Sequence, residues 1–133
     1  MTSVFTKLNL KDEAEIVVLD APASFEGELQ ALRKVTLRRS LGEVGKVVFA
    51  LVFATQKSQV DRLSKSLAAR AEGDAVLWFA YPKGSSKRFK CDFNRDTGWD
   101  VIRAAGWDSV RQVAIDADWS ALRFRRQEFI IRR

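Results

Sequence analysis

Uninterrupted apolar runs mark the strands that this chain is expected to form. The two strongest runs, Val47–Ala54 and Ala75–Ala80, contain no polar residue, which is typical of central strands buried on both faces of a sheet. The shorter runs Ile16–Leu19 and Val35–Leu37 predict two further strands nearer the N-terminus. The pattern therefore predicts a sheet whose central strands come from the middle of the chain.

A helix is expected to connect the two strongest strands. Apolar residues recur there at spacings of three and four, at Val60, Leu63 and Leu67. This periodicity is that of an amphipathic helix packed on a sheet. The sequence predicts that the helix begins at Thr55 or Ser58 and ends at Gly73–Asp74. The strands on either side of it should then lie next to each other through a right-handed crossover.

Two more helices are predicted from capping residues. Ser24 is expected to cap a helix that follows the first strand and carries acidic residues in its first turn, where the helix dipole favours negative charge. A later helix is expected to begin at Asn94 or Asp96 and to run through Ala105, with Gly106 as its stop signal. Strands and helices thus alternate over most of the chain.

The C-terminal part has a different pattern. Val110–Ile115 and Ala121–Phe124 are strand-like, and the short segment between them suits a hairpin rather than a crossover. The predicted fold class is therefore α/β, a three-layer sandwich with a mostly parallel Rossmann-like sheet and a C-terminal antiparallel hairpin. Because the chain has the length of one domain and shows no linker or repeat, residues 1–133 are expected to form a single Rossmann-like α/β domain.

Four segments, in order along nearly the whole chain, carry a resemblance to a known family. They are VLDAP at 18–22, LWFAYPK at 77–83, DFNRD at 92–96 and DADWSALRF at 116–124. In these segments the chain resembles an uncharacterised bacterial family, domain of unknown function 3052. The resemblance implies a compact intracellular Rossmann-like domain with the distant outline of a class I methyltransferase. It implies no established activity and no accepted catalytic residues.

Composition excludes several kinds of chemistry. The chain has no histidine and one cysteine, Cys91, so it has no Ser-His or Cys-His pair, no internal disulfide and no usual set of zinc ligands. No catalytic residue can be named, and the composition favours a domain that is not an enzyme and holds neither metal nor cofactor. The longest apolar run, Val47–Ala54, is far shorter than the ~20 residues of a spanning helix. A cytoplasmic location without membrane contact is therefore expected.

The turn after the first predicted strand bears on the methyltransferase likeness. A dinucleotide-binding protein or a methyltransferase would have a glycine-rich turn there, so that the backbone can approach the ligand. This chain has Asp20–Ser24 in that place, with no glycine. The second predicted strand is followed by Arg38 and Arg39 instead of an acid that would bind a ribose. These residues favour a degenerate Rossmann-like domain that has lost cofactor binding.

The predicted ligand site lies at the carboxyl ends of the parallel strands, where open α/β sheets bind their ligands. The candidate ligand-binding residues there are Lys83, Ser85, Ser86, Lys87, Asn94, Arg95 and Asp20. Basic side chains around exposed backbone N–H groups are the chemistry of an anion site. The leading hypothesis is a non-enzymatic binding or interaction domain that recognises an anionic, phosphate-bearing ligand.

Other interpretations stay open. Asn94 or Asp96 can simply cap a helix, and the lysine-rich loop can be solvated. Asp20, Asp116 and Asp118 would suit Mg²⁺ if they converged, but acids at turns more often accept hydrogen bonds from neighbouring backbone. A degenerate or small methyltransferase-like enzyme is the main alternative function.

Charge keeps nucleic-acid binding as a third hypothesis. The net charge is +6, and residues 31–90 carry thirteen lysines and arginines against four acids. Further arginines cluster near the C-terminus, at Arg123, Arg125, Arg126, Arg132 and Arg133. Charges that guard an edge strand against aggregation would explain Arg123 and Arg125 equally well. The expected partner is therefore a small anionic molecule or a protein, with nucleic acid less favoured.

Overall fold

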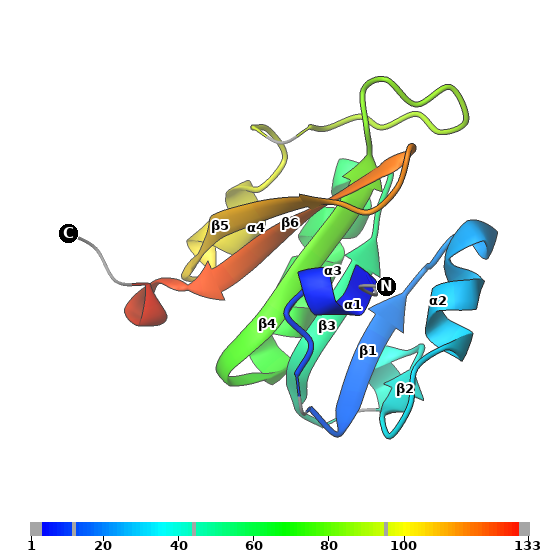
Figure 1. Ribbon diagram of the computed structural model, residues 1–133. Helices are drawn as coiled ribbons and strands as arrows, with labels where there is room; N and C mark the ends of the chain where they lie inside the picture. The colour runs from blue at the N-terminus through cyan, green and yellow to red at the C-terminus, as the bar shows by residue number, and fades with distance from the viewer. Residues whose placement is uncertain (1–3, 12, 44, 95, 131–133) are drawn as a thin grey trace.

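Six strands form one sheet at the centre of the computed structural model, which describes residues 4–11, 13–43, 45–94 and 96–130 (Figure 1). In chain order the strands are β1 (Glu15–Leu19), β2 (Thr36–Arg38), β3 (Val47–Phe53), β4 (Ala71–Pro82), β5 (Trp107–Ala114) and β6 (Trp119–Arg126). The α-helices are α1 (Val4–Lys7), α2 (Glu26–Gln30), α3 (Lys57–Arg70) and α4 (Asp100–Ala104). Short 3₁₀ turns are formed by Ala23–Phe25, Leu41–Glu43 and Gln127–Phe129.

The sheet is parallel over four strands and antiparallel at one edge. Its order is β2-β1-β3-β4-β6-β5, in which β2, β1, β3 and β4 run parallel. β6 returns antiparallel between β4 and β5, so β5 is left as the outer strand. The predicted fold class is confirmed, with its mostly parallel sheet and its C-terminal antiparallel hairpin.

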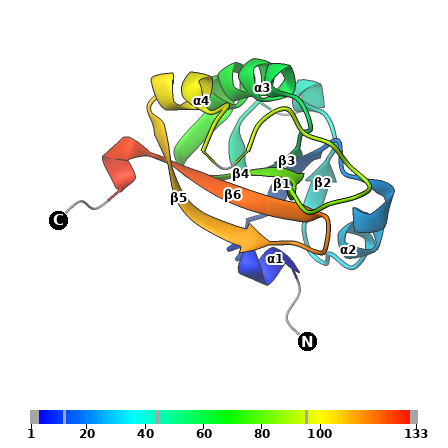
Figure 2. The same cartoon turned by 90° about the horizontal axis from the view of Figure 1, so that it is seen from above.

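Helices cover both faces of the sheet. Figure 2 shows α3 and α4 on one face and α1 and α2 on the other. We call these the α3 face and the α1 face. Each face has its own cluster of buried apolar side chains, so the domain has two cores separated by the sheet.

The position of β3 in the sheet explains why apolar and polar residues do not alternate along it. It lies between β1 and β4, and both of its faces are covered. Ala50 and Val52 face the α3 core, whereas Phe49, Leu51 and Phe53 face the α1 core. Nearly every position of the central strand therefore needs an apolar side chain, as the sequence predicted.

The helix after β3 has different ends from those predicted. It begins at Lys57, with Gln56 as its N-cap, rather than with Thr55 or Ser58 as the capping residue. A hydrogen bond from the Thr55 backbone N–H to Gln59 Oε1, 2.9 Å long, adds to a capping box between Gln56 and Gln59. Glutamine performs a role here that serine or threonine more often has, so the prediction from capping preference was wrong.

Gly73 and Asp74 do not end α3 but belong to β4, which begins immediately after the helix at Ala71. Long-range contacts hold this first part of the strand. Arg126 donates to the Ala71 carbonyl at 2.6 Å, and Arg125 Nε donates to Asp74 Oδ1 at 2.9 Å. Tertiary contacts thus extend the strand through two residues that favour turns.

The other two capping predictions were also wrong. Ser24 lies within the 3₁₀ turn before α2 and makes no cap hydrogen bond. Asn94 does not begin a helix, because its Oδ1 accepts the backbone N–H groups of Asp96 and Thr97, at 2.8 and 3.1 Å. This side-chain turn is an alternative to helix formation, and α4 begins only at Asp100.

One connection departs from the usual βαβ pattern. Parallel strands are generally joined by a dozen or more residues that include a helix, but only residues 39–46 lie between β2 and β3. They contain the 3₁₀ turn of Leu41–Glu43, and their described part holds no α-helix. On the α3 face, β1 is therefore covered by α3 and by this short segment.

None of the described helices combines the length and apolar character required to span a bilayer.

Candidate functional site

The order of the strands reverses between β1 and β3. From β1 the chain goes to β2 on one side, and it then returns to β3 on the other side. Open α/β sheets bind ligands outside the carboxyl ends of the strands at such a point. In this protein those ends lead into Asp20 after β1 and Ala54–Gln56 after β3. One hollow opens at the end of β1, and a second one opens at the end of β4, the strand next to β3.

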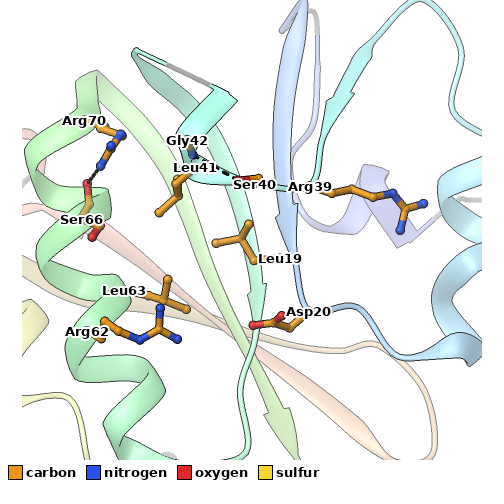
Figure 3. Close-up of a pocket in the computed structure, with 10 residues that line it drawn as sticks. All are labelled: Leu19, Asp20, Arg39, Ser40, Leu41, Gly42, Arg62, Leu63, Ser66 and Arg70. Atoms are coloured by element: carbon orange, nitrogen blue, oxygen red, sulfur yellow. Dashed lines mark hydrogen bonds between the residues drawn. The ribbon is translucent and has the colours of Figure 1, made fainter.

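The first hollow lies beside β1 on the α3 face, where the described residues between β2 and β3 form no α-helix. Its volume is about 370 Å³. We call it the crossover groove, and it is lined by Leu19, Asp20, Arg39, Ser40, Leu41, Gly42, Arg62, Leu63, Ser66 and Arg70. Figure 3 shows Asp20 and Arg62 pointing toward each other across the groove, with Leu63 beside Arg62, Leu19 above Asp20 and Arg39 turned away. The groove is polar at its rim and apolar within.

Asp20 has an unusual backbone conformation at the end of β1. Its φ angle of 58° lies in the left-handed region, which aspartate tolerates better than most residues. The chain then continues into Pro22, which has no N–H, and the Phe25 N–H already bonds to the Pro22 carbonyl at 2.9 Å. This turn therefore lacks one backbone N–H and uses another internally, whereas the Asp20 side chain is exposed.

Arg38, the last residue of β2, and Arg39, which follows it, are both paired with acids of the protein. Arg39 makes two hydrogen bonds to Glu26, at 2.7 and 2.8 Å, and Arg38 bonds Glu15 at 2.9 Å. The bond from Arg39 lowers the pKa of Glu26 below its ordinary value. No carboxylate follows β2 in the position that a ribose would use, in agreement with the sequence.

The second hollow lies at the carboxyl end of β4 and has a volume of about 550 Å³. We call it the edge pocket, and it is lined by Tyr81, Pro82, Lys83, Gly84, Ser86, Phe89, Lys90, Cys91, Phe93 and Asn94. A smaller hollow next to it shares Lys90 and Cys91 and reaches Thr55 and Gln56 at the end of β3. The edge pocket thus combines aromatic rings with two lysines.

The structure brings some of the predicted ligand residues together and separates others. Lys83, Ser86 and Asn94 line the edge pocket. Asp20 lies instead in the crossover groove. Ser85 and Lys87 belong to the same loop as the edge pocket but do not line it, and Arg95 is outside the described residues.

The side chains of Ser86 and Asn94, two of the predicted residues in the edge pocket, form hydrogen bonds that hold the backbone around it. Ser86 Oγ donates to Asp118 Oδ1 at 2.8 Å and accepts the backbone N–H groups of Arg88 and Phe89 at 3.3 Å. The Lys83 N–H bonds the Asp118 carbonyl at 2.8 Å. The Asn94 side chain bonds the backbone of its own turn. Among the three predicted residues that line this pocket, Lys83 is therefore the one whose side chain makes no hydrogen bond or ion pair within the described ranges.

Asp116 and Asp118 have structural roles in the β5–β6 turn. Asp116 Oδ1 accepts the backbone N–H groups of Asp118 and Trp119, at 2.8 and 2.9 Å. Asp118 holds the loop of the edge pocket, as described above. Within the described ranges no three acidic or cysteine side chains gather as metal ligands, so the convergence of Asp20 with these two acids does not occur there.

The N-terminus of α3, a typical place for a bound anion, is taken by a side chain. Asp92 Oδ1 accepts the Lys57 backbone N–H at 2.6 Å, and the Asp92 N–H bonds the Thr55 carbonyl at 3.2 Å. The segment before Phe93 is thereby fixed over the end of β3. A carboxylate of the protein thus occupies the position that a phosphate would take.

Removing this contact should loosen both the helix and the pocket wall. We expect Asp92→Ala to lower the free energy of unfolding by about 1 kcal/mol, the usual cost of a lost helix cap. Urea denaturation of both proteins measures the difference. Asp96→Ala is a matched control, since the side chain of Asp96 makes no hydrogen bond in the described part of the chain. Equal stabilities of the two variants would contradict the assigned role of Asp92.

Cys91 is half-buried between the two hollows at the ends of β3 and β4. Burial raises the pKa of its thiol above the ordinary value, and the charge of Asp92 raises it further. The thiol is therefore less acidic than that of an ordinary cysteine, which makes it a weaker nucleophile near neutral pH. Because it is the chain's only cysteine and lines the edge pocket, its accessibility reports on that pocket.

Aromatic side chains support the pocket from behind. Trp99 lies with its ring centroid 5.2 Å from that of Phe93 and 5.9 Å from that of Tyr81, and its Nε1 donates to the Asn94 carbonyl at 3.0 Å. Gln112 donates to the Tyr81 hydroxyl at 3.1 Å. Trp99 is thus a packing residue of the core.

Four further residues of the edge pocket were not predicted from the sequence: Tyr81, Phe89, Lys90 and Phe93. The available signal was the aromatic residues and lysines that directly follow a central strand. That signal says nothing of how the loop folds back over the strand end.

Comparisons with known proteins support the fold. The chain matches no protein-family profile and no curated protein. Its structure is similar to a SAM-dependent methyltransferase from Aquifex aeolicus, with a TM-score of 0.64 and 12% identity over 92% of this chain and 87% of that one. It is also similar to magnesium protoporphyrin IX methyltransferase (ChlM) from Synechocystis PCC 6803, solved with bound SAM, with a TM-score of 0.59 and 14% identity over 94% of this chain and 77% of that one.

A third similar structure is the N-methyltransferase NodS from Bradyrhizobium japonicum WM9, with a TM-score of 0.56 and 12% identity over 92% of each chain. At such identities the similarity establishes a Rossmann-like fold of the methyltransferase type. The distant methyltransferase outline predicted from the sequence is thus confirmed for the fold. Membership of domain of unknown function 3052 stays a prediction.

Proposed function

We propose that this chain is a reduced methyltransferase-like domain that binds a small anionic molecule with a flat, aromatic group in the edge pocket. The observation that carries the proposal is the composition of that pocket. Three aromatic side chains and two lysines surround about 550 Å³ at the carboxyl end of a central strand. Small-molecule sites are typically apolar hollows of this size with few polar groups.

Each part of the pocket suits one part of such a ligand. Tyr81, Phe89 and Phe93 offer ring surfaces to a flat group. Lys83 and Lys90 offer ammonium groups that make no ion pair within the described ranges, so they attract an anion. The similarity to methyltransferases supports this proposal better than a role in which the domain binds only other proteins.

The methyl donor itself does not fit the ends of β1 and β2. Two of the similar proteins are described with S-adenosylmethionine, as a requirement or as a bound molecule. Here the turn after β1 has Pro22 and no glycine, so the backbone cannot approach a ligand closely. The side chains at and just after the end of β2 are arginines paired with Glu15 and Glu26. The proposed ligand is therefore a substrate-like molecule and not the methyl donor, and no methyl-transfer step is assigned.

Protection of Cys91 tests the proposal directly. The probes are adenosine 5′-monophosphate, which has both a flat base and a phosphate, and adenosine and inorganic phosphate, which each lack one of them. At ten times its dissociation constant, the nucleotide should slow the reaction of Cys91 with a thiol reagent by roughly tenfold at constant pH. Adenosine and phosphate should each need at least a roughly tenfold higher concentration for the same protection.

Two lysine variants provide the specificity control. The double variant Lys83→Met, Lys90→Met should weaken protection by the nucleotide by about tenfold or more, because charge-assisted contacts are lost. Lys87→Met has the same kind of charge change in the same loop but does not line the pocket, so it should bind normally. Unprotected Cys91 at the solubility limit of all three probes, or equal affinity in both variants, would refute the edge-pocket proposal.

A methyl-donor site is a second candidate, favoured by the fold similarity. The same assay distinguishes it from the first. If S-adenosylmethionine raises the Tm without protecting Cys91, and does so equally in the lysine variant, a donor site lies elsewhere, with the crossover groove as the next place to test. If it has no effect on the Tm at low salt, the donor is excluded and the reduced-domain proposal stands.

A further inference from the structure

Three arginines lie together on the α1 face of the C-terminal hairpin, and none of them lines the crossover groove or the edge pocket. Arg111 is on β5, and Arg123 and Arg125 are on β6. Figure 1 shows this face of β5 and β6 toward the viewer, with α4 behind the strands and α1 in front of β3 and β4. We call Arg111, Arg123 and Arg125, with Asp74 beside them, the arginine face. It is a surface that no described helix covers.

The register places two of these arginines directly opposite each other. Arg111 pairs with Arg123 across the antiparallel strands β5 and β6. Side chains in such pairs have Cβ atoms only ~5 Å apart, and like charges there are destabilising. The repulsion between Arg111 and Arg123 therefore destabilises the hairpin unless a nearby negative charge compensates for it.

Asp74 attracts Arg123 but compensates for the pair only in part. Asp74 is engaged with Arg125 through two hydrogen bonds, of which the one from Arg125 Nε is 2.9 Å long. Arg111 makes no hydrogen bond or ion pair within the described residues. The Nε of Arg123 is buried and lacks an acceptor in the same part of the chain. Burial, followed by the charges of Arg125 and Arg111, lowers the pKa of Arg123.

We propose that Arg111 and Arg123 bind a phosphate group on the open face of the β5–β6 hairpin. A tetrahedral oxyanion with several oxygens can accept from two guanidinium groups at once, and guanidinium forks match phosphate geometry. Bound there, it replaces the repulsion between two cations by two attractions. The site is independent of the edge pocket, because the two lie at different places on the sheet.

A simpler role for these arginines makes a different prediction. Arg111 lies on the outer strand β5, and charges on an edge strand prevent unwanted strand pairing. That role would be fulfilled by any charge and would not respond to phosphate. A measurement of stability against phosphate concentration therefore separates the two roles.

The test compares two arginine variants with the original chain at constant ionic strength, with chloride replaced stepwise by inorganic phosphate. At ten times its dissociation constant, phosphate should raise the Tm of the original chain by roughly 4 to 7 °C. Arg111→Gln should lose most of that rise, and in chloride alone its Tm should equal or exceed that of the original chain because the repulsion is gone. Arg33→Gln, an equal charge change between α2 and β2 at the opposite edge of the sheet, should keep the full response.

Two results would overturn the proposal. One is an absence of any phosphate-specific rise in the original chain, and the other is the same rise in Arg111→Gln as in Arg33→Gln. The source of the phosphate follows from a further arm with a short single-stranded oligonucleotide. Binding that Arg111→Gln loses, and that is much tighter than for free phosphate, would identify a nucleic-acid backbone. A response to free phosphate without oligonucleotide binding would identify a small phosphorylated molecule.

Discussion

Replacing Trp99 with alanine is expected to lower the free energy of unfolding by about 4 kcal/mol, a cost typical of deleting a buried aromatic side chain. Trp99 is only 1% exposed. Its ring lies against four other rings, with centroid distances of 5.6 Å to Phe79, 5.9 Å to Tyr81, 5.2 Å to Phe93 and 5.1 Å to Phe124. Urea denaturation, monitored by circular dichroism, measures this change in the free energy of unfolding.

Two phenylalanine variants separate packing from hydrogen bonding. Trp99→Phe keeps a ring but loses the bond to the Asn94 carbonyl, so it should cost about 1 to 2 kcal/mol. Trp119 is also buried, yet its Nε1 has no partner within the described ranges. Trp119→Phe should therefore cost less than Trp99→Phe. A loss below ~1.5 kcal/mol for Trp99→Ala would mean that the cluster of rings is not a main support of the fold.

The consequence of Trp99 for function is indirect. Tyr81 and Phe93 form walls of the edge pocket, and both contact Trp99. A milder variant that still folds, Trp99→Phe, should weaken the protection of Cys91 by a bound nucleotide without changing any residue of the pocket. The core and the proposed site are thus connected through the same ring contacts.

The central strands could be predicted because their surroundings require one kind of residue. β3 and β4 are covered on both faces, so nearly every position in their central parts must be apolar, and few other environments in a folded protein produce such an uninterrupted run. The C-terminal hairpin was predicted for a similar reason, from two strand-like runs with a short polar segment between them. Patterns that depend on burial can be recognised without knowledge of the rest of the fold.

The ends of the elements could not be predicted because they depend on distant residues. β4 begins at Ala71 through bonds from Arg126 and Arg125, which lie at the far end of the sequence. The Asn94 side chain turns the backbone where a helix cap was expected. Capping preferences are local, and here a competing local turn and remote contacts decided the outcome.

The candidate site shows the same limit. The rule that ligands bind at the carboxyl ends of parallel strands directed attention to the loop after β4, where the edge pocket lies. It did not say that Ser86 would be used to hold the loop or that Asp20 would lie in a separate groove. Lys83 is the residue for which the expectation from sequence and the geometry of the pocket coincide. The aromatic walls required the fold of the loop itself.

Gly98 provides the second large effect, because it allows the loop of the edge pocket to pass close to itself. Its φ angle of 94° is one that residues with a side chain rarely adopt, and a Cβ at this position would lie 2.8 Å from Phe93 Cβ. Gly98→Ala should therefore lower the free energy of unfolding by roughly 3 kcal/mol, combining backbone strain with overpacking. Urea denaturation gives the value, and labelling of Cys91 shows whether the pocket wall has moved.

Variants at two other glycines separate the cost of backbone strain from the cost of the close approach to Phe93. Gly106 has a similar φ angle of 96° but open space around it, so Gly106→Ala should cost only the strain, about 1 to 2 kcal/mol. Gly84, in the same pocket, has neither feature, and Gly84→Ala should be close to neutral. The expected order of stability loss is thus Gly98, Gly106, Gly84. If Gly98→Ala cost no more than Gly106→Ala, the close approach to Phe93 would not constrain the loop, and the shape of the edge pocket would have to be held by the Ser86–Asp118 and Lys57–Asp92 contacts instead.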